Sequence, residues 1–181
     1  ICDFFSKYSG DEAKIKWPND LYWRDRKAGG VLIESVVKSQ ESGASQQLEV
    51  GSWQSEGDIQ LQLQSQWQWA VVGIGININQ TSFPAVLPNP VSLKQITGKD
   101  FIPLELAKEV CSVLENNYQL LLAGKFEILF DKYQSHLYKL NEKVKLKKGN
   151  RVFETSIKGV SETGQLITQH SIEERFGSGE V

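Results

Sequence analysis

Three short segments of the chain carry residue types that can bind anions and a nucleotide. The first is Lys16-Trp17-Pro18-Asn19-Asp20. A lysine at a strand end, followed by a turn that proline constrains, places an ammonium, an amide and a carboxylate close together. Asp20 offers the hard oxygen that Mg²⁺ prefers, and this ion usually takes one or two carboxylates besides substrate phosphates. The segment therefore predicts chemistry on a phosphate or another anion.

The second segment begins at Lys27 and continues through Gly29 and Gly30 into an apolar run that ends at Glu34. Glycine has no Cβ, so the backbone can approach a ligand closely while Lys27 presents its ammonium to an anion. A lysine in an ordinary hairpin, followed by a strand that contains glycine, would give the same pattern. Taken alone, Lys27 leaves both interpretations open.

The third segment contains Gly73, Gly75, Asn77 and Asn79. It is not a dinucleotide-binding fingerprint, because Ile78 occupies the place of the third glycine and no helix pattern follows. Two glycines in a β-branched strand indicate the close approach of a ligand or of another backbone. The two asparagines share a strand face and could pair with an adenine edge, but asparagines at a strand end also serve as turn residues.

Other catalytic arrangements are weakly supported. His136 and His170 have no partner at a suggestive spacing, and neither a Gly-x-Ser-x-Gly motif nor a P-loop occurs. Cys2 and Cys111 cannot form a disulfide framework or a four-thiolate zinc site. Cys111 lies on an apolar helical stripe, which predicts a side chain that fills the core.

Composition narrows the class of protein. The chain has 181 residues, 20 Lys+Arg against 22 Asp+Glu, and 40% hydrophobic residues. This acidic balance, with a pI near 5.8, argues against a generic nucleic-acid binder and gives no support for DNA binding by this segment. The apolar run from Ala70 to Ile76 is far shorter than the roughly 18–20 residues that span a bilayer, so we expect no membrane segment. With no signal peptide visible, we expect a cytoplasmic protein.

Hydrophobic periodicity predicts an α+β protein. Ile1 to Tyr8 shows a helical stripe, although no capping residue precedes it, the first residue is not Met, and the chain has no Met at all. We therefore expect that an N-terminal part precedes this segment. The further expected elements are strands at 13–17, 21–23, 30–37 (buried), 59–64 and 67–78 (central), a hairpin turn at 25–27, helices at 103–123 and 126–137, and a small β-barrel from residue 143 onward. We expect a loop or an extended hairpin tip at 38–58 and an irregular loop at 81–90.

In this order, the three segments closely resemble the biotin protein ligases. The Lys-Trp-Pro-Asn-Asp run is highly specific for that family, and residues 30–34 and 73–79 reinforce the likeness. The resemblance implies a mixed or antiparallel central sheet with packed helices, similar to class II aminoacyl-tRNA synthetases. This catalytic domain would be partial and span residues 1–137, and a small SH3-like β-barrel would follow at 138–181. Residues 38–65 would form a longer, more polar connection than is usual.

The family's reaction has two steps, activation of biotin by ATP to biotinyl-5′-AMP and transfer to a lysine of a biotin carboxyl carrier protein, an acetyl-CoA carboxylase subunit. ATP and Mg²⁺ are the implied cofactors and biotin is the substrate. The resemblance makes Lys27 and Lys16 catalytic, with Lys27 contacting the biotin carboxylate and the α-phosphate. It assigns Asp20 to the metal, Lys27, Gly29, Gly30, Val31, Leu32, Gly73 and Gly75 to biotin, and Trp17, Asn19, Asn77 and Asn79 to ATP.

The sequence departs from the family because its Gly-Arg-Gly-Arg-type loop does not occur in this chain. The neighbouring strands and helix of the family, with much of the biotin-binding wall, are also absent. We therefore expect this polypeptide alone to be weakly active or inactive, within a full-length ligase. The alternative is a non-catalytic fragment or sensor that binds biotin or an adenylate. Lipoate ligases share the fold, although the motifs favour biotin, and a plain β-barrel adaptor is a third reading. A homodimer through the open sheet is left undecided.

Overall fold

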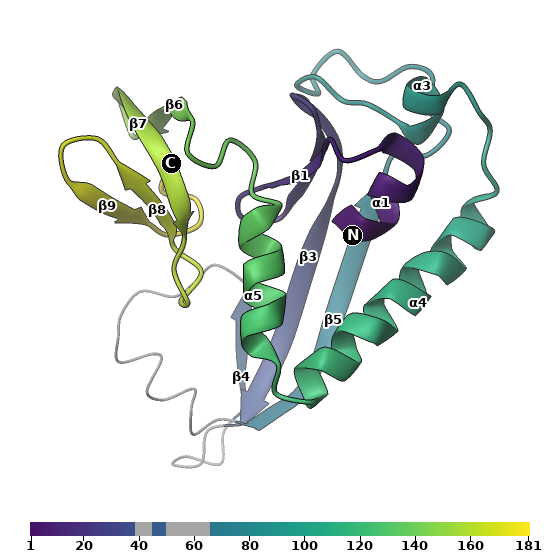
Figure 1. Cartoon of the computed structure of the whole chain (residues 1–181), viewed down its shortest axis with the longest axis horizontal. Helices are drawn as coiled ribbons and strands as arrows, with labels where there is room; N and C mark the ends of the chain where they lie inside the picture. Colours follow the sequence, from purple (N-terminus) through teal and green to yellow (C-terminus); the bar gives the residue numbers. More distant parts are fainter. Residues whose placement is uncertain (39–44, 50–65) are drawn as a thin grey trace. The chain divides into compact units, whose positions relative to one another are not determined.

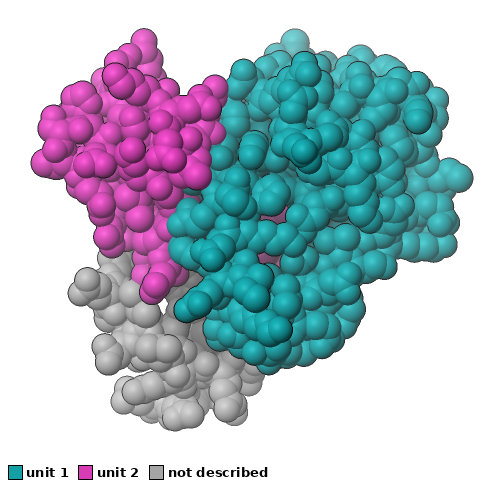
Figure 2. Space-filling model, in the orientation of Figure 1, with its two compact units in different colours: residues 1–30, 74–138 teal, residues 31–73, 139–181 magenta. Residues whose placement is uncertain are grey.

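The computed structural model of the chain describes residues 1–38, 45–49 and 66–181 (Figure 1). These residues fall into two compact units, which Figure 2 colours separately. The first unit comprises residues 1–30 and 74–138, and the second comprises residues 31–73 and 139–181. The chain leaves the first unit within strand β3 (Arg26–Lys38) and returns to it within strand β5 (Gln66–Ile76).

The first unit begins its sheet with an antiparallel hairpin of β1 (Ala13–Lys16) and β2 (Asp20–Trp23), in which Lys16 lies opposite Asp20. Ala13 and Leu21 are buried, and because side chains alternate along a strand, Lys16 and Asp20 lie on the opposite face. The next turn lies at residues 24–25, where Arg24 has a φ of 51°. The expected turn at 25–27 is therefore displaced, and Lys27 lies inside β3.

Helices cover the first unit: α1 (Cys2–Ser9), α3 (Leu93–Thr97), α4 (Pro103–Leu122) and α5 (Phe126–Ser135). The proline at the start of α4 needs no amide hydrogen there, and Gly124, at a φ of 68°, follows its end. Three of these helices confirm the sequence prediction. The short α3 is additional, and a capping box between Ser92 and Gln95 begins it.

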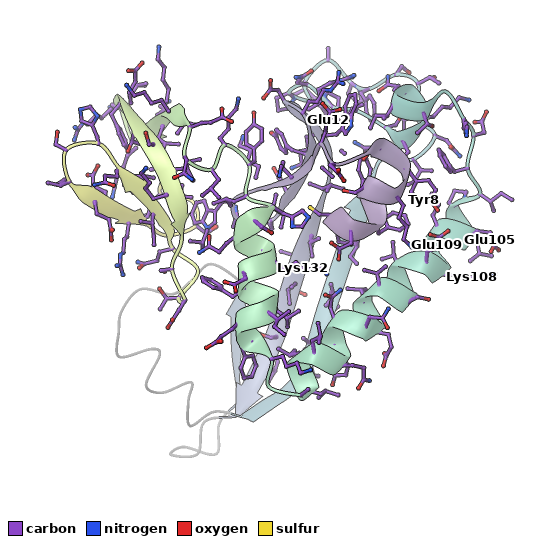
Figure 3. The ribbon with its side chains drawn as sticks, in the orientation of Figure 1. Tyr8, Glu12, Glu105, Lys108, Glu109 and Lys132 are labelled. Atoms are coloured by element: carbon purple, nitrogen blue, oxygen red, sulfur yellow. The ribbon has the colours of Figure 1, made fainter. Side chains whose placement is uncertain are left out.

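The apolar residues of α1 anchor the core of this unit. Phe4 and Phe5 are fully buried in a cluster with residues of β1, β2 and α4. At the surface of the same helix, the Tyr8 hydroxyl donates a hydrogen bond to Glu109 of α4 over 2.7 Å (Figure 3). This bond, with smaller effects of burial and of the Glu109 charge, raises the pKa of Tyr8 to about 12.

Helix α4 buries a face that differs from the one its sequence suggests. Leu106 and Val110 are buried and Leu114 is partly buried, whereas Cys111 and Tyr118 are exposed. The prediction that Cys111 fills the core is therefore wrong. Successive residues are about 100° apart around a helix, so a shift of the buried face by one residue is enough to expose Cys111 to solvent.

Strands β3 and β5 are less buried than expected. In β3, Ser35 and Val36 are buried but Leu32 is exposed, and in β5 Trp69 and Val71 are exposed. The sheet order is β1-β2-β3-β4, and β5 pairs with β3. Strand β4 (Ser45–Glu49) pairs antiparallel with β3, so of the two expectations for 38–58 the extended hairpin fits residues 45–49 and the loop does not. The expected strand at 59–64 lies outside the described residues.

The second unit contains a four-stranded antiparallel sheet in the order β6-β7-β8-β9. Its strands are β6 (Lys143–Lys148), β7 (Arg151–Val160), β8 (Leu166–Gln169) and β9 (Glu173–Phe176). Ile157, Leu166 and Phe176 are buried on one face of this sheet. The sheet is open, with β6 and β9 at its edges, so the expected strands are present but a closed barrel is not shown.

No helix in the described part of the chain is both long and apolar enough to cross a membrane.

Candidate active site

Lys27 lies on the second residue of β3, at a β-bulge. Tyr22 pairs with Lys27 while its neighbour Leu21 pairs with Gly29, so Ala28 is the extra residue of the bulge. Without the bulge, Lys27 and Gly29 would share a face. The extra residue instead places Lys27 on the polar face of the hairpin and Gly29 on the core face, and bulges commonly redirect a side chain in this way beside functional sites.

The Lys27 ammonium forms an ion pair with Asp20. Nζ lies 2.6 Å from Oδ1, and the two side chains are 42% and 28% exposed, respectively. The Asp20 carboxylate therefore fixes the direction of the Lys27 side chain. Because the Lys27 side chain is partly exposed, its ammonium is accessible to an incoming anion. This geometry suits a lysine that binds an anion at the surface of the unit.

The backbone of Lys27 is held on both sides by the segment 89–91. Its amide donates to the Asn89 carbonyl at 3.0 Å, and its carbonyl accepts from the Val91 amide at 2.9 Å. The neighbouring Arg26 guanidinium donates to the Pro90 carbonyl at 2.6 Å. Sequence reasoning predicted only an irregular loop over 81–90, because nothing in its composition indicates that its end bonds to β3.

Lys16 joins the same polar face through Tyr22. Its Nζ donates to the Tyr22 hydroxyl over 3.3 Å and lies 5.1 Å from the centre of that ring, within the range of a cation–π contact. Tyr22 is also the cross-strand partner of Lys27, which places Lys27 beside Tyr22 on the same face of the sheet. We call Lys16, Asp20, Tyr22 and Lys27 the lysine cluster. Its two ammonium groups and one carboxylate give an excess of one positive charge.

Helix α5 fixes the turn that contains Trp17, Pro18 and Asn19. The Tyr133 hydroxyl donates to the Pro18 carbonyl over 3.0 Å, and the Trp17–Pro18 peptide bond is cis. Burial, with a further contribution from Cys2, raises the pKa of Tyr133 to about 12, so this phenol stays a donor at neutral pH. The turn next to Asp20 is therefore attached to the helical part of the unit.

The glycines of the motifs have different surroundings. A Cβ on Gly29 would lie 2.2 Å from the Gly75 carbonyl oxygen, so the approach of two backbones requires glycine there. A Cβ on Gly30 would lie 3.2 Å from the Asp20 carboxylate. A Cβ on Gly75 would meet nothing within 4 Å. A glycine in a strand can admit either a second backbone or a ligand. Gly29 admits the backbone of Gly75, whereas Gly75 itself borders open space.

The two asparagines bond to neighbouring backbone. Asn77 donates from Nδ2 to the Val91 carbonyl over 3.1 Å and, more weakly, to that of Lys27 over 3.4 Å. Asn79 donates to the Phe101 carbonyl over 2.8 Å and accepts from its amide over 3.0 Å. The side chain of Asn79 therefore binds the backbone of Phe101, a role that fits an asparagine that stabilises local chain structure at a strand end. The hydrogen bonds of the described residues leave the Oδ1 of Asn77 as an acceptor.

The remaining expected site residues are distributed over both units. Val31, Leu32 and Gly73 belong to the second unit, where a Cβ on Gly73 would make an ordinary contact with the Leu32 carbonyl. The first unit brings the others together along β1, β2, β3 and the end of β5. Sequence reasoning missed Tyr22 and Tyr133. Tyr22 could have been found from its alternation with Asp20, whereas no local signal marks Tyr133.

A metal site made by the protein alone is not evident. The described residues contain no cluster of three or more His, Cys, Asp or Glu side chains. Asp20 supplies a single carboxylate, and its Oδ1 is already bonded to Lys27. This donor set fits Mg²⁺ only if the ion takes most of its ligands from substrate phosphates and water.

Comparison with known proteins confirms the resemblance drawn from the motifs. Residues 5–52, which include the lysine cluster, match the biotin/lipoate A/B protein ligase family. In the segment that carries the charged site, the chain is thus similar to the biotin and lipoate ligases.

The individual proteins that the chain resembles include biotin protein ligases. The bifunctional ligase/repressor BirA of Escherichia coli is 36% identical over 52 residues, which cover 29% of this chain and 15% of BirA. The apo biotin protein ligase of Aquifex aeolicus matches with a TM-score of 0.68 and 25% identity, over 99% of this chain and 68% of that one. The same enzyme in complex with biotin and ATP matches equally well, over 65% of its chain. The matched segment thus spans a small part of BirA, and the chain spans about two thirds of the Aquifex enzyme.

Proposed function

We propose that the chain carries the adenylate-forming site of a biotin protein ligase. The observation that carries this proposal is the Lys27–Asp20 ion pair on a bulged hairpin, with an ammonium that is both held and exposed. The similarity to an Aquifex ligase that binds biotin and ATP supports the choice of substrates.

In the first step, a carboxylate oxygen of biotin attacks the α-phosphorus of ATP, and the bond to pyrophosphate breaks. Two anions must meet, so their repulsion opposes the attack. Lys27, placed between them, would bind the biotin carboxylate and the α-phosphate, and Lys16 would add positive potential from the same face. Fixed cations of this kind stabilise the charge of a transition state without reorganisation.

Asn77 would bind the adenine. Its Nδ2 is committed to the Val91 and Lys27 carbonyls, so its Oδ1 is the atom that can accept a hydrogen bond from the exocyclic amine of adenine. Guanine carries an oxygen at that position and would be rejected. The other assignments follow the family: biotin would contact Gly29, Gly30, Val31, Leu32, Gly73 and Gly75, and ATP would contact Trp17, Asn19 and Asn79.

Mg²⁺ would arrive with the nucleotide, and Asp20 is the residue of this chain that would face it. When bound, the ion would neutralise phosphate charge.

The second step transfers biotin to a carrier protein, where a lysine amine attacks the acyl carbon and AMP leaves. We further propose that this carrier is a biotin carboxyl carrier protein of acetyl-CoA carboxylase. The catalytic part would span residues 1–137 and an SH3-like barrel residues 138–181, and the protein would be located in the cytoplasm. A homodimer through the open sheet would be compatible with these assignments.

The test replaces Lys27 with alanine and measures binding of a non-hydrolysable biotinyl-adenylate analogue by calorimetry. Lys94→Ala is the matched control, because Lys94 forms an ion pair of similar length, 2.7 Å, with Asp100. We expect Lys27→Ala to lose at least tenfold in affinity, about 1.4 kcal/mol, with little change in stability. Equal affinity in both variants would contradict the proposal. Binding without adenylate formation by the full-length protein would favour the non-catalytic alternative.

A further inference from the structure

Tyr138 contacts the lysine cluster from a distant part of the sequence. Its hydroxyl donates a hydrogen bond of 2.5 Å to the Asp25 carboxylate, 113 residues away. Asp25 lies in the turn between β2 and β3, two residues before Lys27. The ring of Tyr138 also packs against that of Tyr22, with centroids 5.1 Å apart.

The backbone of the same residue is attached to β1. The Tyr138 amide donates to the Ile15 carbonyl at 2.8 Å, and the Ile15 amide donates to the His136 carbonyl at 2.8 Å. Leu137 thereby forms a parallel bridge with Ile15, the residue before Lys16. Tyr138 is thus fixed through its own main chain before its side chain reaches the hairpin.

These contacts reach both lysines by separate routes. Through its ring, Tyr138 supports Tyr22, which in turn holds Lys16 by a hydrogen bond and a cation–π contact. Through its hydroxyl, it holds the Asp25 turn, whose main-chain carbonyl also accepts a hydrogen bond from Asn89.

We propose that Tyr138 is a positioning residue that orients both lysines of the cluster, Lys27 through Asp25 and Lys16 through Tyr22. The proposal rests on the proposed function, since it assumes that the two ammonium groups face a common anion. The hydroxyl route predicts an effect on Lys27, and the ring route predicts an effect on Lys16. Two substitutions therefore separate the routes.

Tyr138→Phe removes the hydroxyl and keeps the ring, whereas Tyr138→Leu removes both. The readout is the NMR signal of each lysine ammonium, which requires no catalytic activity, with Lys94 as an internal control. We expect Tyr138→Phe to shift the Lys27 signal and leave Lys16 in place. Tyr138→Leu should shift both, and the Lys94 signal should stay constant in both variants.

Analogue affinity is measured on the same proteins. We expect Tyr138→Phe to weaken binding of the biotinyl-adenylate analogue about fivefold, as the loss of one hydrogen bond would. Asp25→Asn keeps an acceptor for the phenol and should bind nearly as well as the parent, whereas Asp25→Ala should resemble Tyr138→Phe. The double variant of Asp25→Ala and Tyr138→Phe should be no weaker than either single change.

The outcomes distinguish this inference from the proposed function. If Lys27→Ala weakens analogue binding but Tyr138→Phe changes neither the Lys27 signal nor the affinity, Tyr138 has no positioning role. If Lys27→Ala leaves binding unchanged, the proposed function fails. The lysine signals then still report whether Tyr138 orients the cluster. Equal shifts at Lys94 would show a general structural effect and would also overturn the inference.

Discussion

The sharpest structural prediction concerns the contact between β3 and β5 at Gly29. In a Gly29→Ala variant, the new methyl would lie 2.2 Å from the Gly75 carbonyl oxygen, where ordinary contacts begin at 3.4 Å. Its next neighbours, the Ile76 Cα and the Gly75 carbonyl carbon, are also backbone atoms, at 3.1 Å and 3.2 Å. No side chain can rotate away, so the two strands must separate by about 1 Å.

The expected cost follows from this displacement. Overpacking of a core costs about 1–3 kcal/mol, and the rigid neighbours place Gly29→Ala at the upper end of that range. The lower entropy of the unfolded alanine chain offsets about 0.4–1 kcal/mol. A net loss of about 2 kcal/mol should lower Tm by about 4–8 °C, at about 2–4 °C per kcal/mol for a chain of this length.

The assay is thermal and urea unfolding of Gly29→Ala beside its matched control, Gly75→Ala. A Cβ on Gly75 meets nothing within 4 Å, so the control should be as stable as the parent or slightly more so. It should nevertheless bind the biotinyl-adenylate analogue less tightly, because its methyl enters the space left for a ligand. A Gly29→Ala protein as stable as the control would refute the reasoning.

Three further predictions concern buried groups. Thr155 and Thr168 are buried, and their hydroxyls have no hydrogen-bond partner among the described residues. Replacing either by valine should therefore leave stability unchanged or raise it by about 1 kcal/mol in urea unfolding, and a loss above about 1 kcal/mol would contradict this. The pKa of Tyr133 is raised to about 12, so its stabilising effect is complete below its ordinary value of 10 and is lost as pH rises towards 12. Between about pH 10 and pH 12, the free energy of unfolding should therefore fall less in Tyr133→Phe than in the parent. The same dependence on pH in both proteins would contradict the raised pKa of Tyr133. Burial raises the pKa of Cys2 to about 11 while Cys111 is exposed, so a thiol reagent at pH 8 should modify Cys111 fast and Cys2 slowly, and two fast thiols would be inconsistent with the structure.

Much of the fold could be predicted from local patterns. The helices around Phe4, Val110 and Leu129 follow from apolar spacing, and Pro103 and Gly124 mark two ends correctly. The face of α4 could not be predicted, because its exposed and buried stripes differ by one residue and packing against α1 decides between them. The exposure of Cys111 follows from that tertiary choice.

The candidate site could be predicted in part. Motifs indicated Lys16, Asp20 and Lys27 because their chemistry is visible in the residue types. The sequence did not reveal why position 29 requires glycine. A glycine there could make room for a ligand or for a second backbone, and only the position of β5 distinguishes the two. Tyr138 was also hidden, because its contact with Asp25 joins residues 113 positions apart.

The most direct test of the central claim maps analogue binding onto the chain. A titration of the ¹⁵N-labelled protein with the non-hydrolysable biotinyl-adenylate analogue would report each backbone amide. We predict that the largest shifts fall at Lys27, Gly75 and Asn77, and that they disappear in the Lys27→Ala variant. An absence of shifts at millimolar analogue, or shifts confined to β6–β9, would contradict the assignment of an adenylate-forming site to the lysine cluster.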